Sequence, residues 1–289
     1  MEYVRKGDFF ARQGWYPADR SECQRTVEKL AEGEHPLDAE EARALKAGVV
    51  PHAGWAFSGA PAAQVFKTLG GGEKVDRLVL LGGHMGPQAQ GWILTEGVFR
   101  TPLGEIQGDP EFAQALLSEA GGDFVARGPV SYEPDNTIEL QLPFVKRFMQ
   151  EAKMVVAGVP ATPDGLALGA KAAKLAGSLP GRTVVVGSTD LTHYGVNYGF
   201  MPKGLGPEAV AWVKEENDKK ALDRLQALEA EAYLDEALRL HYACCPGASG
   251  AALVSARELG SERGHLLDYY TSYDIHPGAS FVGYAALVM

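Results

Sequence analysis

The 289-residue sequence predicts a single α/β domain over residues 1–289, with a largely parallel or mixed central sheet flanked by helices. Two observations support this fold class. Short runs of Val, Leu and Ala recur along the chain, and segments with helical spacing separate most of them. Because these runs are apolar at nearly every position, they are typical of strands that are buried on both faces. Strands of this kind alternating with helices indicate a sheet covered by helices on both sides.

The elements follow in order. Strands are expected at 47–50, 77–82, 154–159, 183–188 and 280–289. A first helix begins after Asp19, which forms a capping-box pattern with Glu22, and it ends at Gly33. Further helices are expected at 110–121, 137–152, 165–179, about 207 to 239, and 247–260. The long helix carries many charges of both signs, which is typical of a solvated amphipathic helix. A partner-binding helix is the alternative.

Composition excludes several classes of function. The formal net charge is −10, so the chain lacks the basic surface that a nucleic-acid backbone requires. No apolar run reaches the roughly 20 residues that span a bilayer, and the first residues lack the apolar core of a signal peptide. The three cysteines are Cys23, Cys244 and Cys245, an odd number with two adjacent, which argues against a disulfide framework. We therefore expect a cytoplasmic protein that binds neither nucleic acid nor membrane.

Three histidines lie just beyond the carboxyl ends of expected strands. His52 follows the run at 47–50, His84 follows 77–82, and His193 follows 183–188. In open α/β sheets this edge is where ligand-binding crevices form. One histidine in such a place is usually structural, but three of them favour a shared site. Because neutral imidazole binds iron, copper and zinc, a metal ion explains the pattern best.

The segment STDLTHYG places Asp190 three residues before His193. In a helical turn the two side chains would share a face, and the carboxylate would fix the imidazole tautomer and raise its basicity. His193 is then either a metal ligand or a general base. Asp190 as the N-cap of a short helix is an alternative that is compatible with either role.

Other polar residues are candidates for the same site. Cys244 and Cys245 precede a helix that begins near Pro246, where the helix dipole favours a thiolate, although an inert buried thiol is the alternative. Glu139 lies in the first turns of a helix, either as an exposed acid or as a carboxylate behind the site. The remaining histidines are expected to be structural or at the surface; they are His35, His241, His265 and His276.

Taken together, the motifs resemble those of the Memo family, known in prokaryotes as AmmeMemoRadiSam system protein B. The stretches that carry the resemblance are ARQGWYPADR, VVPHAGWAFSG, LLGGH, NTIELQLPF, STDLTHYG and LLDYYTSYD followed by SFVGYAALV. They occur in the family's order over nearly the whole chain. The resemblance implies a fold similar to class III non-haem iron extradiol dioxygenases, with a site of three histidines and one cysteine that is associated with iron or copper.

Residue by residue, the family's site residues match His52, His84, Asp190, His193 and Cys244. The resemblance thus implies a metal held by His52, His84 and Cys244, with Fe(II) or copper as the expected ion and zinc as the weaker candidate. His193 and Asp190 would be catalytic. Trp15, Asn136 and Glu139 would bind substrate or contact the ligands.

The chain departs from the family pattern in three places, the first being LLGGH, which is shorter than the family's usual Gly-Pro-Ser/Asn-His stretch. Asn136 stands where the family commonly has histidine, and it cannot carry a proton as histidine does. Cys245 stands where glycine is usual and adds a second soft donor, which would favour Cu(I).

Three functions remain open at this stage. The first is a dioxygenase-like oxidoreductase in which His193 takes a proton from an unknown small phenolic or acidic substrate. A thiolate in place of the usual carboxylate ligand argues against it. The second is a metal-binding or redox adaptor with a protein partner and no turnover. The third is a metal-free hydrolase with Cys244 as nucleophile, His193 as base and Asp190 as orienter, which leaves two histidines unexplained.

Overall fold

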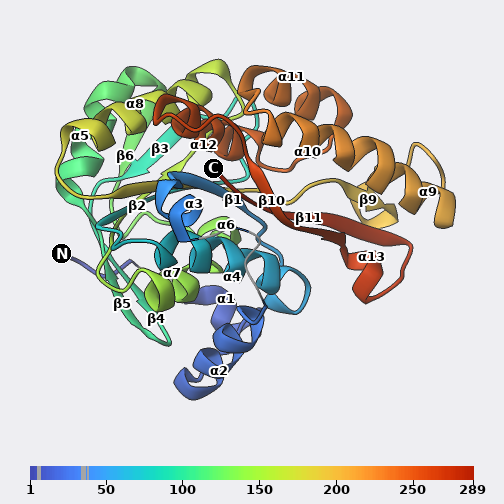
Figure 1. Cartoon of the computed structure of the whole chain (residues 1–289), viewed down its shortest axis with the longest axis horizontal. Coiled ribbons are helices and arrows are strands. Elements are labelled where there is room, and N and C mark those ends of the chain that lie inside the picture. The colour runs from blue at the N-terminus through green and yellow to red at the C-terminus, as the bar shows by residue number, and fades with distance from the viewer. Residues whose placement is uncertain (5–7, 34–36, 38) are drawn as a thin grey trace.

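A nine-stranded sheet runs through the computed structural model, which describes residues 1–4, 8–33, 37 and 39–289 (Figure 1). His35 therefore lies outside the described residues. The strands follow in spatial order: β10 (His265–Thr271), β11 (Ser280–Val288), β1 (Ala47–Val50), β8 (Thr183–Ser188), β2 (Arg77–Gly82), β7 (Lys153–Gly158), β3 (Gly91–Leu94) and β6 (Phe124–Arg127). The ninth strand, β9 (His193–Gly195), pairs with β11 outside this path, and β4 (Val98–Thr101) and β5 (Gly104–Gln107) form a separate hairpin.

The sheet is mixed, with a parallel centre. β1, β8, β2 and β7 are parallel to one another, whereas β11 runs antiparallel to β1 and to β10. On the other side, β3 runs antiparallel to β7 and parallel to β6. The five expected strands are confirmed with boundaries within one residue. The other six strands are additions to the expected set. β3, β4, β5 and β6 are only four residues long. β4, β5 and β6 are also partly exposed and carry no continuous apolar run, whereas β3 is apolar and buried but short.

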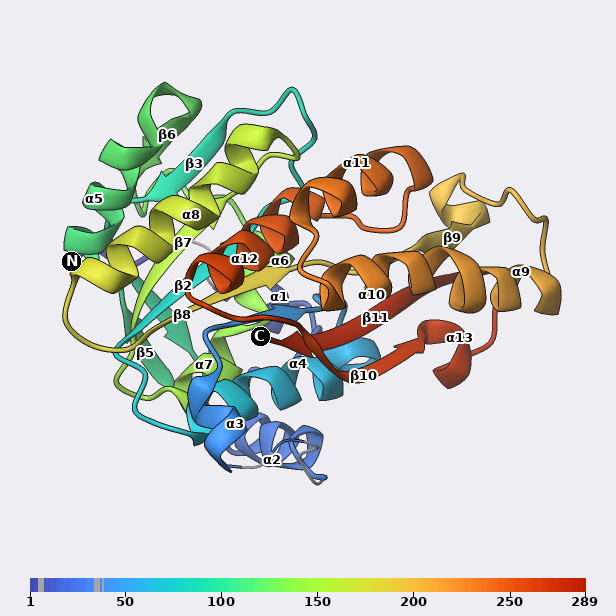
Figure 2. The same cartoon turned by 45° about the horizontal axis from the view of Figure 1, so that its top comes forward.

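Helices cover the sheet on both faces, and Figure 2 shows the two helical layers. One core packs side chains of α5 (Pro110–Ala120), α8 (Pro163–Ser178), α11 (Ala230–Leu240) and α12 (Pro246–Glu258) against the sheet. The other uses α2 (Arg20–Leu30), α4 (Trp55–Gly71) and α7 (Leu142–Phe148). Successive strand residues alternate between these cores, as Val49 and Val50 do, because side chains of a strand point to opposite faces. The expected two-sided coverage is confirmed.

Several helices differ from the expectation. Asp19 caps α2 by accepting from the Glu22 amide at 2.9 Å, but α2 ends at Leu30, before Gly33. The expected helix at 137–152 is divided into α6 (Asn136–Glu139) and α7, since Pro143 has no N–H to continue an α-helical ladder. Helix α4, at 17 residues, was not expected, because Gly54, Gly59 and Pro61 made its sequence resemble a loop.

The expected long helix at about 207 to 239 is divided into three α-helices, and a π-helical turn joins the first two of them. α9 (Pro207–Trp212) continues through a π-helical turn (Val213–Asn217) into α10 (Asp218–Gln226), and α11 follows after Leu228, whose φ of 56° ends the helical path. Short segments complete the fold: α1 (Phe9–Arg12), α3 (Ala39–Ala44), α13 (Ser272–Ile275), and the 3₁₀ turns η1 (Gly121–Asp123) and η2 (Val196–Tyr198).

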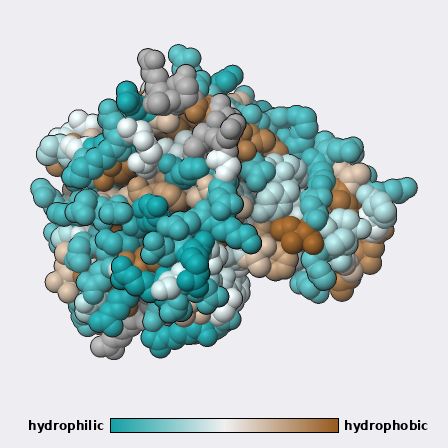
Figure 3. Space-filling view, turned by 60° about the horizontal axis from the view of Figure 1, so that its bottom comes forward, coloured by the Kyte–Doolittle hydropathy of each residue, from teal (hydrophilic) through white to brown (hydrophobic). Residues whose placement is uncertain are grey.

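One end of the molecule projects beyond the two helical layers. It contains β9, α9, α13 and the adjoining ends of β10 and β11 (Figures 1 and 2). A small core of its own, around Tyr194, Val213 and Phe281, supports it. Hydrophobic residues also gather on its surface (Figure 3), where Val196 and Leu205 are 57% and 55% exposed. None of the helices in the described parts of the chain is long and apolar enough to cross a membrane.

Candidate metal centre and adjoining cavity

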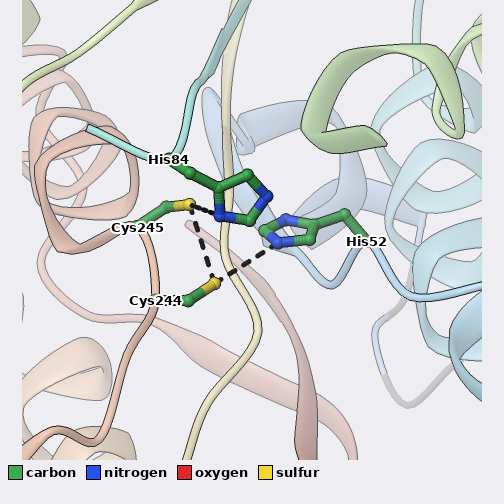
Figure 4. Close-up of side chains that lie close together, drawn as sticks. All are labelled: His52, His84, Cys244 and Cys245. Atoms are coloured by element: carbon green, nitrogen blue, oxygen red, sulfur yellow. Dashed lines mark hydrogen bonds between the residues drawn. The ribbon is translucent and has the colours of Figure 1, made fainter. Parts of the chain in front are cut away.

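Four potential metal donors meet at the carboxyl edge of the parallel strands (Figure 4). His52 follows β1, His84 follows β2, and Cys244 and Cys245 precede α12. One donor atom from each residue lies within 4.8 Å of the others. β1 and β2 end at the same edge because both are parallel to β8, which lies between them. The structure therefore brings together His52, His84 and Cys244, as expected, and it adds Cys245 to them.

The spacing of these atoms suits a tetrahedral ion. Cys244 Sγ is 3.3 Å from His52 Nε2 and 3.6 Å from Cys245 Sγ, and Cys245 Sγ is 3.5 Å from His84 Nδ1. With metal–sulfur bonds of about 2.3 Å and metal–nitrogen bonds of about 2.0–2.1 Å, a tetrahedron has S···S and S···N edges of about 3.8 and 3.6 Å. These three pairs fit such a tetrahedron, and since all four donor atoms lie within 4.8 Å of one another, the set can hold one ion once the wider pairs close by about 1 Å.

His52 is fixed by its surroundings on both its backbone and its ring. Its amide donates to Asp190 Oδ1 at 2.7 Å, and its Nδ1 lies 3.0 Å from Ser188 Oγ. With Nδ1 engaged by the serine, Nε2 faces Cys244. Burial disfavours the imidazolium, but the charges of Asp190 and Cys244 outweigh burial and raise the pKa of His52 to about 9. An ion at this site would replace that proton as the positive charge.

Asn136 determines which nitrogen of His84 is available. Its Nδ2 donates to the His52 carbonyl at 3.0 Å, and since a carbonyl only accepts, this contact fixes the orientation of the amide. Asn136 Oδ1 then lies 3.0 Å from His84 Nε2, which must carry the hydrogen. The lone pair is left on Nδ1, the atom that faces Cys245. Asn136 thus contacts His84, a potential metal donor, and leaves its Nδ1 able to bind an ion.

The two adjacent thiols have opposite acidities. Burial alone would raise the pKa of Cys244, but its hydrogen bond with Cys245 and the neighbouring His52 hold that pKa well below its ordinary value. The Asp190 amide also donates to Cys244 Sγ at 3.3 Å. Burial and the Cys244 sulfur raise the pKa of Cys245 well above its ordinary value. Cys244 is therefore the thiolate of the pair, as its assignment as the metal ligand requires.

The expected pairing of Asp190 with His193 is wrong in its geometry. Residues 189–192 form neither a helix nor a strand, so there is no helical turn to align the two side chains and no helix for Asp190 to cap. The segment stays extended because the Leu191 amide bonds to the Gly283 carbonyl of β11. Asp190 contacts His52 instead, and His193 Nδ1 lies 3.1 Å from the Leu191 carbonyl.

A cavity of about 530 Å³ adjoins the donor cluster. Its lining includes aromatic side chains, two histidines and several small polar residues: Trp15, Phe57, Tyr198, Tyr284, His193, His276, Ser272, Ser280, Asn136 and Asp190. His193 and Trp15 thus lie at a possible ligand site, as expected. Asn136 and Asp190 line the cavity and also contact His52, so they form the wall between the cavity and the cluster.

Sequence reasoning missed part of this lining. His276, expected to be structural or at the surface, is exposed and also lines the cavity just after α13. Ser280, Val282 and Tyr284 were not singled out either. Their spacing of two along β11 places them on one face of that strand, a periodic signal that the sequence does contain. Tyr198 and Phe57 carry no comparable signal.

Glu139 does not line the cavity, and neither of its expected roles is the one observed. The side chain is 1% exposed. Its Oε1 accepts from the amides of Phe10 and Ala11 at 2.7 and 3.2 Å and from the Tyr16 hydroxyl at 3.2 Å. Glu139 therefore anchors the segment that carries Trp15 to the cavity wall. Burial outweighs these hydrogen bonds and raises the pKa of Glu139 to about 7.

Fold and site together define a single-domain α/β protein with a mixed sheet and a His/Cys cluster that can hold a metal ion beside a cavity. A model of the Memo-like protein family matches residues 12–288. The chain is 32% identical to a MEMO1 family protein of Methanopyrus kandleri and 30% identical to one of Thermococcus onnurineus. The alignments cover 95% of this chain and 95% and 96% of those proteins. The chain belongs to the Memo family.

A solved structure supports the fold alone. An uncharacterized protein of Escherichia coli K12 superposes with a TM-score of 0.54 at 14% identity. The match covers 85% of this chain and 99% of that protein.

Proposed function

We propose that the chain is a metal-dependent oxidoreductase that acts on a small molecule bound in the cavity. The observation that carries this proposal is the shared wall, because Asn136 and Asp190 contact the donor cluster on one side and line the cavity on the other. A bound ion and a bound molecule would therefore lie one side chain apart.

The metal would be held by His52 Nε2, His84 Nδ1 and Cys244 Sγ. Imidazole suits iron and copper, and a thiolate shifts the preference toward Cu(I) and zinc. Because zinc has no redox chemistry, Fe(II) or copper remains our assignment for an oxidoreductase. The bound ion would supply redox chemistry and a positive charge beside the cavity.

His193 has the tautomer that a general base needs. The Leu191 carbonyl can only accept, so the contact at 3.1 Å places the hydrogen on His193 Nδ1 and leaves Nε2 able to take a proton. Because the imidazole lines the cavity, a substrate hydroxyl there can be its proton donor. No lysine or arginine of the described residues lines the cavity, whereas Trp15, Phe57 and Tyr284 offer aromatic surfaces. A neutral, planar phenolic compound fits this lining best.

The test is oxygen uptake by the protein purified without oxygen and loaded with Fe(II) or Cu(I), offered a panel of phenols and catechols. We expect His193→Ala to keep its metal and to lose about 100-fold or more in kcat. His241→Asn is the matched control, since His241 lies at an exposed helix end in a left-handed conformation that asparagine tolerates. No uptake beyond that of the metal-free protein with any compound would count against an oxidoreductase.

A second function, metal holding without turnover, is favoured by one observation. All four donors lie close enough together to bind one ion, and none of the four residues lines the cavity. A closed four-donor site is typical of structural or storage sites, whereas catalysis needs an open position. In that case Cys244→Ala and Cys245→Ala would weaken Cu(I) binding to a similar degree. If the site is catalytic, Cys245→Ala will keep metal and turnover, and Cys244→Ala will lose both.

The metal-free hydrolase with His193 as base has the least support. Cys244 Sγ contacts His52, and His193 is not among its hydrogen-bond partners in the described part of the chain. Asp190 Oδ2 lies 3.9 Å from His52 Nε2, the nitrogen that also contacts Cys244 Sγ. The carboxylate and the sulfur thus meet the same nitrogen, so Asp190 does not orient the His52 ring from the opposite nitrogen as a catalytic triad requires.

A further inference from the structure

A buried carboxylate on α10 reaches the loop between Asp190 and His193. Asp218 is the first residue of α10, and its side chain is fully buried. Its Oδ1 accepts from both the amide, at 3.0 Å, and the hydroxyl of Thr192. Its Oδ2 accepts from the Tyr269 hydroxyl of β10 at 2.8 Å. Thr192 immediately precedes His193, so this network ends one residue from the cavity.

Two consecutive residues at the junction of the π-helical turn and α10 contact the same threonine. The side-chain amide of Asn217 donates to Thr192 Oγ1, at 3.0 Å, and to the Leu240 carbonyl at 3.2 Å. The Thr192 hydroxyl therefore accepts from Asn217 and donates to Asp218. Single π turns inside α-helices are frequent at functional sites.

Strand β11 leaves room for this carboxylate through a glycine. A Cβ at Gly283 would lie 2.0 Å from Asp218 Oδ2. The same glycine holds the loop, since its carbonyl accepts from the Leu191 amide at 2.8 Å and its amide donates to the Thr192 carbonyl at 3.0 Å. The amide and hydroxyl of Thr192 are thereby held by Asp218 and its carbonyl by Gly283. This fixed residue lies between Asp190 and His193 in the chain.

We propose that Asp218 is a positioning residue that, through Thr192, holds the His193 imidazole at the cavity and the Asp190 carboxylate on His52. The role of His193 as the base rests on the proposed function, but its placement does not. Burial raises the pKa of Asp218 to about 6, while its hydrogen bonds with Thr192 and Tyr269 favour the ionised form. An ionised carboxylate is the partner that suits three donors.

The experiment observes the histidine rings by NMR in metal-free protein labelled with [¹³C]histidine, with His193→Ala assigning the His193 signal. We expect Asp218→Asn and Thr192→Val to shift the His193 signal. Thr192→Ser keeps the hydroxyl and should retain the wild-type signal. Asp223→Asn is the matched control, because Asp223 is an exposed aspartate of the same helix that pairs with Lys219.

Unchanged His193 signals in folded Asp218→Asn and Thr192→Val would overturn the proposal. If Asp218→Asn does not fold, the Thr192→Val and Thr192→Ser pair decides, since Thr192→Val is nearly isosteric and removes only the hydroxyl, whereas Thr192→Ser keeps it. With turnover in hand, Thr192→Val should lower kcat about 10–100-fold at unchanged metal content, because small displacements of a catalytic group have effects of this size. A shifted signal without turnover in the wild type would instead refute the oxidoreductase and leave the positioning role standing.

Discussion

At the scale of single residues, the cluster depends on side chains that touch a donor without being donors themselves. Asn136 is such a residue, because one amide group binds the His52 carbonyl and the far nitrogen of His84. In this chain the asparagine cannot exchange a proton, but it can still fix the His84 tautomer.

We predict that Asn136→Ala weakens binding of Fe(II) or Cu(I) about 10–100-fold, the usual effect of losing a partner of a metal-binding histidine. Competition with a chromophoric chelator measures the affinity. Asn197→Ala, at an exposed position, is the control and should bind metal like the wild type. Equal affinities for all three proteins would show that the amide does not prepare His84.

Glu139 should produce a pH dependence of stability. Its folded-state pKa of about 7 lies above the ordinary 4.5, so the folded state holds a proton that the unfolded state releases between these values. The wild type is therefore destabilised, relative to Glu139→Gln, as pH rises from about 4.5 to about 7. One pKa unit corresponds to about 1.4 kcal/mol, so the difference should grow by about 3 kcal/mol and then stay level.

Urea unfolding of both proteins between pH 4.5 and 8 measures this difference in the free energy of unfolding. Glu215→Gln, at an exposed position, serves as the control. A difference between Glu139→Gln and wild type that stays constant over this range would contradict the raised pKa.

At the scale of elements, the helices over the sheet approach one another most closely where glycines allow it. The Gly169 carbonyl of α8 accepts from Ser255 Oγ of α12 at 2.8 Å. A Cβ at Gly169 would lie 2.0 Å from the Ala251 carbonyl oxygen of α12. This contact helps to set the position of α12, whose first turn follows Cys244 and Cys245.

Two glycines of the same helix should respond to alanine in opposite directions. Gly169→Ala forces α8 and α12 apart and should lower the free energy of unfolding by about 1–3 kcal/mol. Gly177→Ala should raise it by about 0.5–1 kcal/mol, because no atom lies within 4 Å of the new methyl group and alanine favours helix. Chemical denaturation distinguishes the two, and destabilisation by both would show that helix propensity and packing are not separable here.

At the scale of the whole molecule, the donor cluster joins three distant parts of the chain. His52, His84 and Cys244 come from two strand ends and from the segment before α12. The unfolded chain cannot hold them together, so an ion that binds the cluster must stabilise the fold.

Metal should therefore raise the thermal stability of the protein. At an ion concentration 1,000 times its Kd, we expect the free energy of unfolding to rise by about 4 kcal/mol. Differential scanning calorimetry with and without Fe(II) or Cu(I), in the absence of oxygen, measures the change. His52→Ala should show no shift and His241→Asn the full one; a shift that survives His52→Ala would place the ion elsewhere.

Much of the architecture was predictable because apolar runs report burial directly. The strands at 47–50, 77–82 and 183–188 are observed with those boundaries, since a central parallel strand must be apolar on both faces. The short strands β4–β6 and the helix α4 were not predictable. Their sequences are partly polar or rich in glycine and proline, and only their neighbours in space make them strands or a helix. β3 is apolar, but its four residues are too few to stand out as a buried run.

The candidate site divides in the same way. By itself, the sequence determined the class of fold, the sheet edge at which His52 and His84 meet, and the family, whose resemblance implied Cys244 as a third ligand, because strand order along the chain and motif residues are local properties. It also placed His193 with the two histidines, whereas the structure puts His193 at the cavity and not in the donor cluster. Only the tertiary structure decided that Cys245 completes the cluster, that Asp190 contacts His52 rather than His193, and that His276 and Tyr284 line the cavity. These are contacts between residues far apart in the chain, and their geometry depends on how helices and strands pack.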